Sequence, residues 1–293
     1  MKELGARLSL SALVRAFWRR TSLTWAITLA ETALLAALPL LIGRSIDGLL
    51  ADDWRPFALL IGAVALLLVV AVGRRVYDTR VYGSMRAALG SAIVERAQSR
   101  PVSAVNARLT MGRELVDFLE EELPLVLTAT IQVIASVVIL FSFHSALAAS
   151  AGAASAALLI VYGAAARRFF RLNRDLNAQA EEQVTRIESG VMEAVRTHLL
   201  SIRRHEVRLS DTESIVYGLI FGLLMAMLAF NLWFAATKTG ASPGEIFSIV
   251  TYSYEFMESA VILPVALQSL TRISEITERI NASSQSVEAD ANA

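Results

Sequence analysis

The sequence contains no cysteine, and its only two lysines are Lys2 and Lys238. Without cysteine the chain can form neither a disulfide framework nor a thiolate metal site. Its 27 basic residues, nearly all of them arginine, balance 27 acidic residues, so the net charge is zero. Bulk electrostatics therefore indicates neither a nucleic acid nor an acidic protein as partner.

Apolar residues, by contrast, are abundant. They make up 55% of the 293 residues, and the mean hydropathy is +0.53, well above the mixture found in soluble domains. Six apolar segments reach, or nearly reach, the length needed to cross a hydrocarbon layer of about 30 Å. These segments are residues 23–43, 57–73, 125–143, 146–166, 215–236 and 243–268. The sequence predicts an all-α membrane protein with six transmembrane helices in a lipid bilayer.

Basic residues set the predicted orientation, because they collect on the cytoplasmic side of a membrane. The N-terminus, residues 74–122, residues 167–213 and the C-terminus hold 24 of the 27. Both termini and both long loops are therefore predicted to be cytoplasmic. Residues 1–22 lack the cleavage site of a signal peptide and combine one apolar side with arginines, which predicts an interfacial helix.

The two long loops are predicted to be helical hairpins. Residues 74–100 repeat apolar positions at helical spacing without proline, so the second helix should continue into the cytoplasm and end at Pro101. The same pattern predicts that the fourth helix continues to about Arg204. Only about nine residues then separate Glu206 from the fifth apolar segment, so the return leg of this hairpin is predicted to be short.

This order of segments resembles the membrane domain of ATP-binding-cassette exporters, from about residue 8 to residue 280. Arg100-Pro101-Val102-Ser103, with Thr110 to Leu115 after it, is similar to the first coupling loop of that family. Further resemblances cover residues 193–206 (second coupling loop), 240–247 (the loop before the last helix) and 272–276 (the exit helix). The resemblance implies a six-helix membrane domain over residues 23–280, preceded by the N-terminal region 1–22. The small, polar residues 281–293 predict a disordered tail.

The sequence also departs from that family. A fused ATPase needs the phosphate loop G-x-x-x-x-G-K-[ST], and no Gly-Lys pair occurs in this sequence. The chain is therefore predicted not to be an enzyme. Ala104 and Val105 stand where the resemblance implies aromatic residues that dock into an ATPase, and the short return leg argues against docking as well.

Three carboxylates lie in the interior of apolar segments: Glu31 in the first, and Glu255 and Glu258 in the last, well beyond Glu245 in its first turn. Each would cost several kcal/mol as a charged group facing lipid, so we expect them to face protein, water or a ligand, or to be protonated. No arginine or lysine lies within an apolar segment to pair with them. The last helix should begin near Pro243, because Ser242 and Glu245 have the spacing of a capping box.

These carboxylates and nearby hydroxyl groups form the predicted substrate- or proton-binding set. Its members are Thr28, Glu31, Thr251, Tyr252, Glu255 and Glu258. An alternative is structural: the acids could hydrogen-bond to hydroxyls such as those of Thr28 and Tyr252 and hold the helices together. The three histidines, His144, His198 and His205, lack the spacing of a metal site, and neither a cofactor nor a catalytic site is predicted.

By resemblance, the preferred hypothesis is a homodimeric transporter of the bacterial inner membrane that lacks an ATPase. It would move a cationic or amphipathic small molecule or peptide by alternating access, with proton coupling, as bacterial peptide importers of this fold do. One alternative is the membrane subunit of a transporter with a separately encoded ATPase. Another is a non-transporting scaffold or regulator whose arginine-rich hairpins bind a partner.

Overall fold

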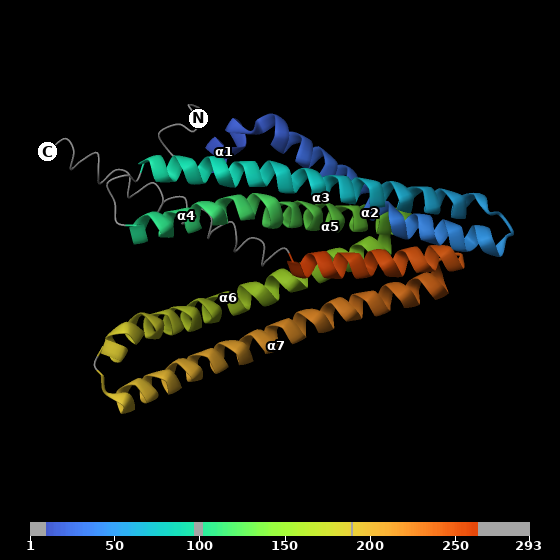
Figure 1. The fold of residues 1–293 in the computed structure, drawn as a ribbon. Coiled ribbons are helices and arrows are strands. Elements are labelled where there is room, and N and C mark those ends of the chain that lie inside the picture. The colour runs from blue at the N-terminus through green and yellow to red at the C-terminus, as the bar shows by residue number, and fades with distance from the viewer. Residues whose placement is uncertain (1–9, 97–101, 189, 263–293) are drawn as a thin grey trace. The chain divides into compact units, whose positions relative to one another are not determined.

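A computed structural model of the chain describes residues 10–96, 102–188 and 190–262 (Figure 1). In these ranges every regular element is a helix. The elements are α1 (Leu10–Ala16), α2 (Trp18–Leu50), α3 (Arg55–Arg96), α4 (Val102–Asp117), the π-helical turn η1 (Phe118–Glu122), α5 (Leu123–Phe143), α6 (Ser145–Glu188) and α7 (Met192–Lys238). A last helix covers residues 243–262. The predicted all-α class is confirmed.

Five helical stretches of the described chain are long and apolar enough to cross a membrane: α2, most of α3, residues 108–143, α6 and α7. The sixth predicted segment, residues 243–268, is helical as far as residue 262. Its last residues, the predicted exit helix at 272–276 and the tail at 281–293 lie outside the described residues. The same holds for Arg100 and Pro101 of the predicted first coupling loop.

Helix α3 extends well beyond its apolar part, as predicted. Its 42 residues span about 63 Å at 1.5 Å per residue, roughly twice the hydrocarbon thickness. Residues 57–73 are long enough to cross most of the bilayer, so residues 74–96 lie outside the membrane-spanning segment. The arginines of α3 are thus free to contact polar groups of neighbouring helices.

The second hairpin differs from its prediction. Helix α6 ends at Glu188 and α7 begins at Met192, so the prediction of a descending helix to about Arg204 is wrong. Gly190 ends α6 because it adopts φ +66°, which favours glycine, and its N–H donates to the Ile187 carbonyl at 3.1 Å. Both legs, residues 167–188 and 192–213, contain 22 residues. The return leg is therefore not short, and residues 193–206 belong to α7, not to a loop.

The described chain divides into two compact units. One contains α1 to α4, η1, residues 123–139 of α5 and the last helix; the other contains the rest of α5 with α6 and α7. In the second unit α6 and α7 pack against each other as a long hairpin (Figure 1). All the predicted carboxylates lie in the first unit.

The apolar core of the first unit joins α1, α3, α4 and η1. Its fully buried side chains include Leu13 of α1, Tyr82 and Met85 of α3, and Leu115 and Leu119 of the returning leg. Burying an apolar side chain of this size stabilises a fold by about 1.5–3 kcal/mol. This core fixes η1 against α3 and gives α1 a protein contact, while the position of α1 at the membrane surface stays a prediction.

Candidate functional site

The last helix begins where the sequence predicts. The N–H of Glu245 donates to the Ser242 hydroxyl oxygen at 3.2 Å, and the Ser242 N–H donates to the Glu245 carboxylate at 2.9 Å. This reciprocal capping box satisfies two N–H groups that the first turn leaves without helical partners. It fixes the start of the helix and therefore the side on which each of its polar residues lies.

Asp47 of α2 holds this start in place. The N–H of Gly244 donates to Asp47 Oδ1 at 2.8 Å, and the hydroxyl of Ser242 donates to Oδ2 at 2.5 Å. A Cβ atom added to Gly244 would lie 1.9 Å from the carbonyl oxygen of Gly43. The two backbones thus approach as closely as glycine allows, and sequence reasoning missed Asp47 because it lies 197 residues from its partner.

Further contacts continue down α2. The Ser248 hydroxyl donates to the Pro39 carbonyl at 2.9 Å, and the Tyr252 hydroxyl donates to the Ala36 carbonyl at 2.7 Å. Tyr252 is completely buried, so its hydroxyl joins two helices and is closed to a ligand. The hydroxyl of Thr251 donates within its own helix, to the Phe247 carbonyl at 2.9 Å.

Glu255 and Glu258 lie one turn apart, next along the same helix. The carboxylate of Glu255 is half-buried and accepts a hydrogen bond from the side-chain amide of Gln132 in α5. Glu258 is exposed. Over residues 10–96, 102–188 and 190–262, neither carboxylate forms a salt bridge. Glu255 is therefore held in place by a neutral group, and no basic side chain of the described ranges pairs with it.

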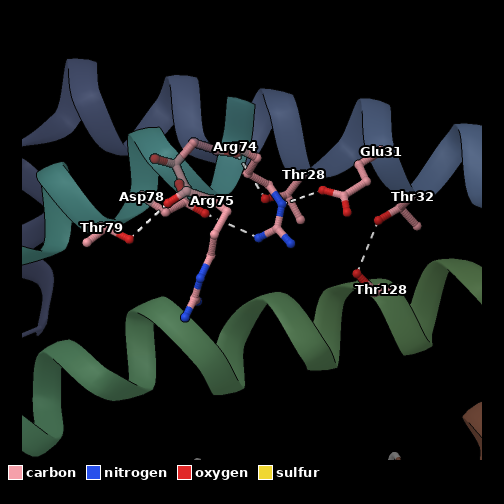
Figure 2. Close-up of polar contacts among 9 residues, drawn as sticks. Thr28, Glu31, Thr32, Arg74, Arg75, Asp78, Thr79 and Thr128 are labelled. Atoms are coloured by element: carbon pink, nitrogen blue, oxygen red, sulfur yellow. Dashed lines mark hydrogen bonds and ion pairs between the residues drawn. The ribbon is translucent and has the colours of Figure 1, made fainter. Parts of the chain in front are cut away.

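Glu31 has a different environment, because it forms an ion pair with Arg74. No basic residue lies within an apolar segment, as the sequence shows, but a basic residue just beyond one of them pairs with Glu31. Arg74 is the first residue after the apolar segment of α3, and the tight turn between α2 and α3 brings it beside Glu31 (Figure 2). Glu31 therefore lies at the level where this apolar segment ends. Thr28 bonds within α2, to the Thr24 carbonyl at 3.0 Å.

Arg74 also donates to Asp78, from Nη1 to Oδ2 at 3.2 Å. Figure 2 shows its guanidinium between Glu31 and Asp78, whereas Arg75 points away from both. The side chain of Asp78 is only 4% exposed, against 14% for Glu31. Burial raises the pKa of Asp78 above its ordinary value, and nearby Glu120 acts in the same direction, while Thr24 and Arg74 oppose both.

A second ion-pair cluster lies further along α3. Arg86 donates from Nε to Asp117 Oδ1 at 2.8 Å and also pairs with Glu120 of η1. Burial acts to lower the pKa of Arg86, but its bonds to Asp117 and Glu120 outweigh burial and raise it. Burial also raises the pKa of Tyr82, which lies between the two clusters.

Arg74, Asp78, Tyr82 and Arg86 follow one another at intervals of four residues, and we call them the α3 polar row. Residues four apart lie on the same side of a helix, so the row faces α2 and η1 together. The sequence analysis did not predict this row, because its charged members lie outside the apolar segments, where charge is common on a helix surface. The spacing itself is visible in the sequence and could have identified it.

Comparison with known proteins agrees with this arrangement. Residues 10–244, which are 235 of the 293, match the family model described as ABC transporter transmembrane region. The match includes Glu31 and the α3 polar row but ends before Glu255 and Glu258. No curated protein sequence matches the chain. Several long apolar helices and this match identify a membrane domain of the transport type, and the chain belongs to the ABC transporter transmembrane region family.

Proposed function

We propose that the chain forms the membrane-spanning part of a homodimeric transporter, and that Glu255 and Glu258 receive a positive charge during transport. The charge is either a proton or the cationic group of a small molecule or peptide. The observation that carries this proposal is the state of Glu255, whose half-buried carboxylate bonds to the neutral amide of Gln132.

An ionised carboxylate inside a membrane protein is costly unless a positive charge compensates it. Glu31 has such compensation from Arg74. Among the described residues, Glu255 and Glu258 form no ion pair, and their spacing of three residues places them on one helix face. Of the predicted set, these two groups are therefore open to bind a proton or a cation, and Tyr252 positions the helix that carries them.

Purified chain in liposomes tests this proposal with ethidium as the cationic probe and pyranine as the trapped pH indicator. We expect a pH gradient to drive ethidium movement, with Glu255→Gln reducing the rate at least about tenfold and Glu258→Gln reducing it less. Glu121→Gln is the matched control, because Glu121 is an exposed carboxylate on η1. Ethidium movement that is independent of the pH gradient and unchanged in both variants would contradict the proton and cation roles.

The α6–α7 hairpin supports the homodimer. It has a groove of about 620 Å³ lined mainly by alanine, with Leu223, Met227 and Phe230 along one wall. Small side chains let membrane helices approach closely, so the groove fits a helix of a second copy. Ala153→Trp should fill the groove and shift the mass in lipid nanodiscs from dimer to monomer. Leu159→Trp is the control, since Leu159 is 70% exposed and outside the groove.

The bacterial inner membrane and cytoplasmic termini are part of the same proposal. A chain without cysteine allows single cysteines to be introduced and labelled without background. An impermeant maleimide applied to intact bacterial cells should label Lys238→Cys and leave Arg196→Cys unlabelled. The reverse pattern would invert the proposed orientation.

A second candidate is transport driven by a separately encoded ATPase, because membrane domains of this family typically work with one. The two 22-residue legs of the α6–α7 hairpin favour it, since the apparent shortness of the return leg was one reason to doubt docking. Co-purification of an ATP-hydrolysing subunit, with ethidium movement that requires ATP, would support this candidate. Movement driven by a pH gradient alone would reject it.

A further inference from the structure

The α3 polar row carries more negative than positive charge. Its two arginines, Arg74 and Arg86, face four carboxylates. Three of these side chains are at most 14% exposed: Glu31 of α2 at 14%, Asp78 of α3 at 4% and Glu120 of η1 at 8%. Asp117 is 41% exposed and can be solvated by water. Two partly buried arginines are therefore the ion-pair partners of four carboxylates, three of them largely buried and one exposed.

Burial decides which of the four carboxylates is most readily neutralised by a proton rather than by an arginine. A carboxyl group removed from water favours its neutral form, and a second carboxylate nearby adds to this preference. Asp78 has the least exposed side chain of the four and shares Arg74, its ion-pair partner in the described part of the chain, with Glu31. The negative charge of Glu120 also acts on it. The charged and titratable groups around it are Arg74 and Tyr82 of α3, Glu31 of α2 and Glu120 of η1.

Asp78 and several residues near it carry buried polar atoms without a partner in the described part of the chain. Within the described residues, no hydrogen-bond partner is present for Asp78 Oδ1, the Tyr82 hydroxyl, the Thr24 hydroxyl or Trp25 Nε1, all of them buried atoms. Thr24 and Tyr82 are completely buried, and Asp78 is 3% exposed. Thr24 lies beside Asp78, and Trp25 beside Tyr82, without the geometry of a complete hydrogen bond. Buried groups of this kind normally bind a proton, an ion or an internal water.

The neighbours of Asp78 favour a proton over a metal cation. The guanidinium of Arg74 lies 3.2 Å from Asp78 Oδ2, which would repel a metal ion at the other oxygen. Trp25 Nε1 can only donate, so it cannot be a ligand to a cation. A proton neutralises the carboxyl without needing a coordination shell, and it gives the carboxyl a hydrogen-bond donor that a bridging water can accept.

We propose that Asp78 is a proton-binding site, which takes up one proton per chain at the end of the membrane-spanning part of α3. With the proton bound, Arg74 is left to compensate Glu31 alone. When the proton leaves, Arg74 is shared between two carboxylates, and a charge appears beside Glu120. The site thereby links the pH on the arginine-rich side to the contact between α2 and α3. Proton binding at Asp78 requires no movement of a substrate, so it can be tested whether or not the chain transports a cation.

Infrared spectroscopy of the purified full-length chain in lipid nanodiscs tests this proposal. An ordinary aspartate loses its proton, and with it its protonated carboxyl band, as the pH rises through about 3.8. We expect one carboxyl band of the wild-type chain, the one that Asp78→Asn removes, to persist to a higher pH than the bands of exposed aspartates. Asp117→Asn, at the exposed carboxylate, should leave the band unchanged.

Tyr82→Phe provides a second test if Asp78→Asn does not fold, because it keeps the carboxyl and removes the hydroxyl beside it. The proposed site predicts that the band remains in Tyr82→Phe and that its frequency shifts. A difference band between wild type and Asp78→Asn that titrates at the ordinary aspartate value of 3.8, or below it, would overturn the proposal. An unshifted band in Tyr82→Phe would overturn it as well.

Discussion

Replacement of Gly244 by alanine should separate the last helix from α2. The new Cβ atom would lie 1.9 Å from the carbonyl oxygen of Gly43, while real Cβ atoms essentially never come closer than 3.0 Å to such an atom. The contact must therefore lengthen by at least 1.1 Å, the difference between the two distances. The obstacle is backbone, which cannot move aside as the end of a flexible side chain can.

The expected loss of stability has two parts. Overpacking of a close contact typically costs about 1–3 kcal/mol. A displacement of this size also weakens the bonds of Gly244 and Ser242 to Asp47 and the bond of Ser248 to α2, and interhelical hydrogen bonds in membranes average about 0.6 kcal/mol each. Loss of all three bonds would add about 1.8 kcal/mol, so the expected destabilisation is about 3–5 kcal/mol.

Equilibrium unfolding in mixed micelles of increasing SDS content measures this change. Gly62→Ala is the matched control, because no atom lies within 4 Å of a Cβ added at Gly62. It should be neutral or stabilise the chain by up to about 1 kcal/mol, as alanine does in an exposed helix. If Gly244→Ala unfolds at the same SDS fraction as Gly62→Ala, the backbones at Gly43 and Gly244 do not approach each other as closely as described.

Three further predictions concern the bonds between helices and the proton site. Arg74→Gln should destabilise the chain by about 1–3 kcal/mol, because it leaves Glu31 and Asp78 without their shared cation, whereas Arg75→Gln should change stability by less than about 0.5 kcal/mol in the same SDS assay. Tyr252→Phe should cost about 1 kcal/mol through the lost bond to the α2 carbonyl, and an unchanged unfolding midpoint would show that this bond contributes nothing. Because burial raises the folded-state pKa of Asp78, its contribution to stability is fully present below the ordinary value of 3.8 and is lost as the pH rises through the folded value. Thermal unfolding across this window should therefore depend more steeply on pH in the wild type than in an Asp78→Asn variant, and equal slopes would contradict the shift.

The sequence determined the class of this protein and most of its helices. Apolar segments of membrane length are local features, and so are the helical repeats that continue one of them into a longer helix. The capping box at Ser242 and Glu245 is local as well, since its atoms lie three residues apart. The end of α6 was predicted wrongly because apolar residues keep their helical spacing on both sides of Gly190. The helix nevertheless stops there, because Gly190 adopts a positive φ.

Tertiary structure decided the partners of the polar groups. Glu31 and Arg74 are 43 residues apart, Gln132 and Glu255 are 123, and Asp47 lies 197 residues from Gly244. A sequence states which residues carry charge, but the free energy of a charge in a membrane depends on which group faces it across the helix contact. For this reason the same residue type pairs with an arginine at Glu31 and, within the described part of the chain, with only a neutral amide at Glu255. This difference arises only when α2, α3, α5 and the last helix pack together.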